Sequence, residues 1–180
     1  MHGIVHKSLK SYVVAKAGGE TWDTIVEQAD IEPTLYLSVS RYDDAEIDAV
    51  LEALASMAVQ DRPAIERDFG RSLAPELCST FDAHLDDEAE LLEGLTSLEA
   101  ITATVERTTT ETTLPSVTCA EDDRAVVVRY DSHRDYCDLA HGVLEGLVAE
   151  SDAEATVTER VCVRNGAGDC AFRVELEELE

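Results

Sequence analysis

The stretch from Val126 to Val174, VVVRYDSHRDYCDLAHGVLEGLVAESDAEATVTERVCVRNGAGDCAFRV, decides the fold of this chain. Both of its ends are rich in β-branched residues, which favours strands, and the middle has the apolar spacing of a helix. A further β-prone segment precedes it, separated by the turn Glu121-Asp122-Asp123. The pattern predicts ββαββ, with strands over 116–120, 124–130, 153–163 and 169–176, a helix over 138–150 and a glycine-rich turn at 165–168.

Before Pro115 the apolar residues recur at helical spacing instead. Gly70 and Pro75 indicate a break in this region. The predicted helices cover residues 3–17, 20–29, 45–57, 62–69, 77–85 and 87–106. We therefore expect one α+β domain over residues 1–180. A helical subdomain (1–107) should pack on a ββαββ subdomain (115–180) with an antiparallel four-stranded sheet and one crossing helix.

The composition predicts a folded chain with an acidic surface. Its 39 acidic residues outnumber 14 basic ones, which gives a net charge of −25, and an apolar share of 44% argues against disorder. Such a surface repels nucleic acid and anionic membranes. This excess of acidic over basic residues resembles that of cytoplasmic proteins of salt-accumulating halophilic archaea. The alternative is an acidic protein from a mesophile. Without a signal peptide or an apolar run of about 18 residues, we expect a cytoplasmic protein with no membrane insertion.

Tyr130, Ser132 and Arg134 follow one another at a spacing of two residues. On a strand end this spacing places three polar donors on one face, where they suit an anionic group. A plainer interpretation is that the three side chains pair with the many carboxylates of the chain. The residues themselves leave both interpretations open.

Four residues of the same stretch have the spacing of a metal site. Cys162 and Cys170 flank the turn at 165–168, Glu159 precedes Cys162 by three residues, and Cys137 lies just before the helix. Three thiolates and a carboxylate would complete a closed, structural Zn²⁺ site. Because a reducing compartment disfavours disulfides, the alternative is that the cysteines are small buried hydrophobic residues.

Motifs of catalysis are missing from the sequence. There is no G-x-S-x-G nucleophile motif and no Gly-rich phosphate loop. We therefore expect a protein that is not an enzyme. The apolar residues expected to line a ligand pocket are Ile4, Val5, Pro115 and Leu144.

Three separated motifs resemble the haem-nitric-oxide/oxygen-binding (H-NOX) family. The chain opens with M-H-G-I-V-x-K-S-L-K-x-Y-V-V, continues with G-G-E-T-W-D-x-I and later carries Tyr130-x-Ser132-x-Arg134. The resemblance covers nearly the whole chain. It implies an H-NOX-like fold in which these three side chains bind the haem propionates. The C-terminal half is similar to four-vinyl-reductase-type sensor domains, which implies that the cysteine–glutamate set binds zinc.

The chain departs from the family at the iron ligand. Family members use a histidine on the long helix before the proline-bearing segment. Counted back from Pro115 without a gap, Thr102 has this position, and a gapped alignment puts Glu99 there. Threonine is no haem ligand, and glutamate is a poor one. His84, upstream of the helix, is a weak substitute.

The resemblance implies a stand-alone sensor module. In one version it binds haem, and through haem NO or O₂, or a related hydrophobic anion. In the alternative it is a haem-free small-molecule sensor or protein-interaction module with a structural zinc site. Because 180 residues leave no room for an effector domain, either version needs a separate signalling protein of the histidine-kinase, cyclase or transducer type.

Overall fold

A computed structural model describes residues 2–32, 34–38, 40–81, 90–108 and 114–177. The sheet has the order β1-β2-β4-β3, and every neighbouring pair is antiparallel. The predicted α+β fold is therefore confirmed. The elements are α1 (Gly3–Ala17), α2 (Gly19–Gln28), α3 (Asp44–Met57), α4 (Arg62–Phe81), α5 (Leu91–Thr108), β1 (Ser116–Asp122), β2 (Ala125–Asp131), α6 (Cys137–Glu150), β3 (Ala155–Val161), the 3₁₀ turn η2 (Val163–Asn165) and β4 (Cys170–Leu176).

Local side-chain chemistry sets the ends of several helices. His2 Nδ1 accepts a hydrogen bond from the Ile4 amide (3.4 Å) at the start of α1. Asp43 Oδ1 accepts one from the Ala45 amide (3.0 Å) at the start of α3, as aspartate commonly does at a helix N-cap. Gly18, whose φ of 88° favours glycine, ends α1.

Helix α4 corrects one of the sequence predictions. Gly70 and Pro75 were expected to separate two short helices, but one helix runs from Arg62 to Phe81 with Pro75 inside it. A Cβ at position 70 would lie 2.4 Å from the carbonyl oxygen of Leu139 in α6. The glycine therefore permits close packing of α4 on α6 and does not end the helix. Residues 82–89, where the rest of the second helix and the start of the next one were predicted, lie outside the described residues.

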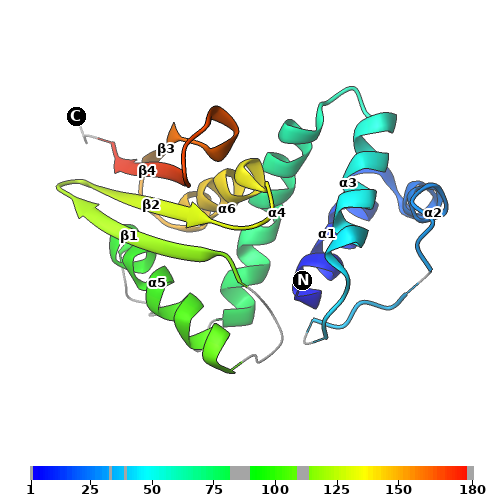
Figure 1. The fold of residues 1–180 in the computed structure, drawn as a ribbon, viewed down its shortest axis with the longest axis horizontal. Helices are drawn as coiled ribbons and strands as arrows, with labels where there is room; N and C mark the ends of the chain where they lie inside the picture. Colours follow the sequence, from blue (N-terminus) through cyan, green and yellow to red (C-terminus); the bar gives the residue numbers. More distant parts are fainter. Residues whose placement is uncertain (1, 33, 39, 82–89, 109–113, 178–180) are drawn as a thin grey trace.

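The buried side chains form two clusters. One joins α1, α2, α3 and α4 with Tyr136 and Leu139, and the other joins α5, α6 and the inner face of the sheet. Figure 1 shows α1 to α3 on one side of the molecule, α4 and α6 in the middle, and α5 with the sheet on the other side. By packing, α5 thus belongs with the sheet, although it precedes residue 115 in the chain.

The sheet has one buried and one exposed face. Val126, Val128, Phe172 and Val174 point to the inner face and are at most 3% exposed. Helices α5 and α6 both pack on this face. Among the described residues, no helix is both long and apolar enough to cross a membrane.

Candidate functional site

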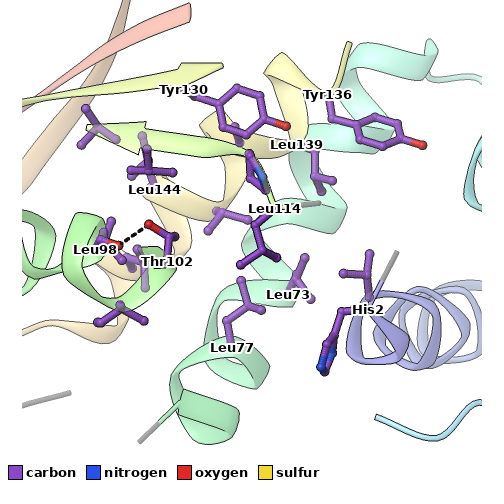
Figure 2. Close-up of a pocket in the computed structure, with 18 of the residues that line it drawn as sticks. His2, Leu73, Leu77, Leu98, Thr102, Leu114, Tyr130, Tyr136, Leu139 and Leu144 are labelled. Carbon is purple, nitrogen blue, oxygen red and sulfur yellow. Dashed lines mark hydrogen bonds between the residues drawn. The ribbon is translucent and has the colours of Figure 1, made fainter. Parts of the chain in front are cut away.

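An apolar cavity of about 310 Å³ lies where the two clusters meet. This volume is within the range of small-molecule pockets. Side chains from α1, α4, α5, α6 and the sheet line it, as Figure 2 shows for a subset of them. The lining residues include all four that the sequence singles out for a pocket: Ile4, Val5, Pro115 and Leu144.

Two of the three motif residues reach this cavity. Tyr130 and Arg134 line it, whereas Ser132 does not. Strand β2 ends at Asp131, so Ser132 lies just beyond the strand, where its Oγ accepts a hydrogen bond from the Arg134 amide (3.2 Å). Burial raises the pKa of Tyr130 to about 12. Its hydroxyl is therefore neutral and able to donate at ordinary pH.

The Arg134 guanidinium also meets a carboxylate of the same chain. Its Nε donates to Asp44 Oδ2 (2.5 Å), and the two side chains form an ion pair in which they are only 12% and 29% exposed. Burial works to raise the pKa of Asp44, but the positive charge around it, including that of Arg134, lowers the pKa overall. Arg134 thus pairs with a carboxylate of the chain, as the plainer interpretation of the motif expects, and it also borders the cavity.

The structure distinguishes between the two residues aligned with the family's histidine. Thr102 lines the cavity, and its Oγ1 donates to the carbonyl oxygens of Leu98 (2.9 Å) and Glu99 (3.0 Å) within α5. Glu99 is exposed, and its Oε2 accepts from the Cys119 amide instead (3.3 Å). Of the two residues, Thr102 therefore faces the cavity and Glu99 does not. His84 lies outside the described residues.

Three of the four residues predicted to bind metal come together. The Sγ of Cys170 lies 2.8 Å from that of Cys137 and 3.6 Å from that of Cys162, and all three side chains are buried. In a tetrahedral zinc site with Zn–S bonds of about 2.3 Å, the sulfurs lie about 3.8 Å apart. Small movements would therefore admit the ion.

Glu159 does not belong to this group. The described residues that could offer ligand atoms within 4.8 Å of one another are the three cysteines alone. The Glu159 side chain is exposed on the edge strand β3, next to the register shift between Glu159 and Val161. The sequence spacing did not reveal this shift, because a bulge alters the side-chain direction that simple alternation predicts.

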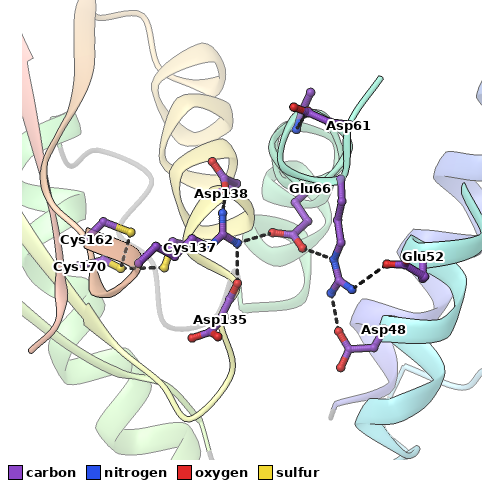
Figure 3. A network of polar contacts seen from close by, with 12 residues as sticks. Asp48, Glu52, Asp61, Glu66, Asp135, Cys137, Asp138, Cys162 and Cys170 are labelled. Atoms are coloured by element: carbon purple, nitrogen blue, oxygen red, sulfur yellow. Dashed lines mark hydrogen bonds and ion pairs between the residues drawn. The ribbon is translucent and has the colours of Figure 1, made fainter. Parts of the chain in front are cut away.

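A polar network lies beside the cysteine cluster and joins the start of α6 to α4 and α3 (Figure 3). Arg164, two residues after Cys162, forms an ion pair with Asp138 and approaches Glu66 Oε2 (3.4 Å). Glu66 is 1% exposed, and its Oε1 accepts from Arg62 Nε (2.7 Å). The i,i+4 spacing of Arg62 and Glu66 is a local signal, but no local pattern predicts the contact of Glu66 with Arg164, which is 98 residues away.

The comparisons with known proteins agree with this geometry. The Haem-NO-binding family matches residues 2–159. An H-NOX protein triple mutant from S. oneidensis in the Fe(II) state is 24% identical with a TM-score of 0.90, covering 100% of this chain and 98% of that one. The Fe(II) unliganded H-NOX protein from K. algicida is 18% identical with a TM-score of 0.84, covering 99% and 98%.

A third similar structure is a Shewanella oneidensis H-NOX domain in which a histidine is replaced by glycine, in the Fe(II)CO ligation state. It is 22% identical with a TM-score of 0.88, covering 99% of this chain and 100% of that one. No curated protein matches the chain. The chain belongs to the haem-NO-binding (H-NOX) family, whose domains are sensor modules and not enzymes.

The pocket fits one part of a haem group and not another. Its apolar walls suit the ring, and Tyr130 and Arg134 suit carboxylates. At the position of the iron ligand, however, Thr102 donates its hydroxyl to its own helix. The described lining residues therefore fit the macrocycle and its acidic groups, and they do not fit the metal in the way the family implies.

Proposed function

We propose that this chain is a sensor domain whose pocket binds haem or a related hydrophobic anion and reports its occupancy to a separate signalling protein. The observation that carries the proposal is the apolar cavity bordered by the donors Tyr130 and Arg134. Bound haem would supply an iron that takes up a gas. The similar domain with a histidine replaced by glycine is in a CO-ligated state, which supports haem binding by a member that lacks one histidine.

The protein's own residues supply a route for the response. Arg134 lies beyond β2, whereas its partner Asp44 lies in the first turn of α3. A carboxylate of the ligand would compete with Asp44 for the guanidinium. Ligand binding would thereby change a contact between the sheet side and the helical side of the molecule, and α3 would move or loosen.

Titration of the purified chain with haemin tests the proposal. We expect a shifted Soret band that saturates near one haemin per chain. Arg134→Ala should weaken binding roughly 10- to 100-fold, since a hydrogen bond to a charged group contributes about 1.5–3 kcal/mol. Arg129→Ala is the matched control, because Arg129 pairs with Asp169 on the exposed side and does not line the cavity. A spectrum unchanged by haemin would reject the haem version.

The cysteine cluster supports a second role, that of a structural zinc site. The ligand set we propose is Cys137, Glu159, Cys162 and Cys170, in which the Glu159 carboxylate would have to turn toward the three sulfurs. Metal analysis should find about one zinc per chain, and less than about half would reject the site. Glu159→Gln tests the fourth ligand. Zinc affinity unchanged by this substitution would assign the fourth position to another group.

A haem-free small-molecule sensor or protein-interaction module is the alternative function. It is favoured by Thr102, which replaces the expected iron ligand, together with a cysteine cluster that does not depend on haem. Zinc bound at about one per chain without any response to haemin would select it.

A further inference from the structure

At Thr102 the cavity lacks the histidine with which the family ligates iron. Because its Oγ1 donates to the carbonyl oxygens of Leu98 and Glu99, the hydroxyl hydrogen is directed along α5. A neutral threonine hydroxyl is not among the side chains that ligate haem iron. Figure 2 shows Thr102 beside Leu98 on α5, with its hydrogen bond along the helix.

The other donors along the cavity are poorly suited to the centre of a macrocycle. Tyr130 is a neutral phenol, and burial together with the charge of Glu150 raises the pKa of Cys78, which favours its thiol form. His2 uses Nδ1 to cap α1. In Figure 2 its ring lies away from both Thr102 and Tyr130.

We therefore expect this pocket to recognise the ring and the acidic groups of a ligand, and not a metal at its centre. Apolar side chains of four helices and three strands would cover the faces of a ring, and Arg134 and Tyr130 border the cavity where acidic groups could reach them. Neither contribution changes when the metal of a porphyrin is removed. A family member with an axial histidine differs in this respect, because a metal–ligand bond adds to the affinity for the metallated ring alone.

We propose that this pocket recognises dicarboxylic porphyrins by their ring and carboxylates and is indifferent to the metal, so that iron-free protoporphyrin IX is a ligand equal to haemin. The inference rests on the proposed function, since both require a porphyrin-type ligand. It goes further by naming the ligand class and by making Thr102 the residue that sets the specificity.

Direct competition tests the inference. Protoporphyrin IX fluorescence is followed as it binds the full chain in the KCl concentration that keeps the protein folded, with enough mild detergent to keep both porphyrins monomeric. Haemin is then used to displace it. We expect dissociation constants that agree within about threefold, and weakening of both by Arg134→Ala. Protoporphyrin and haemin both failing to bind would reject the proposed function itself.

A gain-of-ligand variant gives the sharper readout. Thr102→His should strengthen haemin binding at least about tenfold, or about 1.4 kcal/mol, and shift the Soret band, while protoporphyrin affinity stays the same and reports an intact pocket. Haemin binding more than about tenfold tighter than protoporphyrin in the unmodified chain would overturn the inference and leave the proposed function standing. Loss of that preference in His2→Ala or His84→Ala would then identify the hidden iron ligand.

Discussion

At the scale of single residues, His6 shows a histidine used as core. It is 2% exposed, and its ring centroid lies 5.2 Å from those of Tyr36 and Tyr42. Its Nε2 is 2.9 Å from the carbonyl oxygen of Asp43, while Nδ1 has no hydrogen-bond partner among the described residues. Burial lowers the pKa of His6 below 6.5, although the nearby charge of Glu46 opposes this. The folded protein therefore holds this ring neutral.

We predict that stability falls as the pH is lowered from about 7.5 toward 5.5. In this window the unfolded chain takes up a proton on His6 near its ordinary pKa of 6.5, whereas the folded chain does not. His2 and His141, whose pKa values are also lowered by burial, act in the same direction. Urea unfolding at several pH values measures the slope.

His6→Gln should reduce that slope, because one of the contributing groups is gone. His133→Gln is the matched control, since this histidine is exposed on the segment between β2 and α6. An identical pH dependence in His6→Gln and the unmodified chain would contradict the role assigned to His6.

Single residues also show how far the sequence could predict the site. Alternation predicted Tyr130, Ser132 and Arg134 on one strand face, but β2 ends at Asp131 and only Tyr130 and Arg134 line the cavity. The cysteine spacing was enough to expect the cluster of three sulfurs. The partner Asp44 lies 90 residues from Arg134, and no local pattern encodes a contact at that distance. The departure of Glu159 from the cluster has a similar origin, because the β-bulge beside it depends on strand pairing.

At the scale of elements, the contact between α4 and α6 holds the two core clusters together. The helices approach so closely that a Cβ at Gly142 would lie 2.0 Å from the Arg67 carbonyl oxygen, and one at Gly146 would lie 2.5 Å from the Ala74 Cβ. Glu145, between these glycines, accepts hydrogen bonds from Arg67 (3.0 Å) and from Arg71. Packing and an ion-pair network thus fix one helix on the other.

We predict that Gly142→Ala destabilises the protein by about 1–3 kcal/mol, because the added methyl group has no space and must push α4 away from α6. Gly94→Ala is a matched change within a helix, and no atom lies within 4 Å of the added Cβ. This control should be neutral or stabilising by up to about 1 kcal/mol, as expected for glycine replaced inside a helix. Chemical denaturation of both variants decides, and equal stabilities would contradict the packing argument.

The packing of α4 on α6 explains why the sequence predicted most elements correctly but divided α4 into two helices. Apolar spacing located α1, α3, α6 and the four strands, because each buries one face and its boundaries depend on local turns and caps. It failed for α4, where Gly70 and Pro75 have the signature of a break. Tertiary packing against α6 overrides that local preference, and the sequence of α4 alone does not contain this information.

At the scale of the whole molecule, charge is the dominant feature. Among the described residues, seven arginines form ion pairs with carboxylates and reduce the repulsion among neighbouring acidic side chains, yet the net charge of the chain is −25. Several of these contacts join elements far apart in the chain, so the ionic network and the fold depend on each other. The paired arginines are Arg62, Arg67, Arg71, Arg129, Arg134, Arg164 and Arg173.

We predict that added salt stabilises this protein, because screening weakens the repulsion among surplus carboxylates more than it weakens the half-buried ion pairs. The Debye length falls from about 10 Å at 0.1 M salt to about 3 Å at 1 M. The melting temperature should therefore rise steeply between 0.1 and about 2 M KCl. Sucrose at equal osmolality is the control for solvent exclusion and should have a smaller effect. A melting temperature independent of KCl would place the chain among ordinary acidic proteins, since the compact state would then tolerate a net charge of −25 without screening.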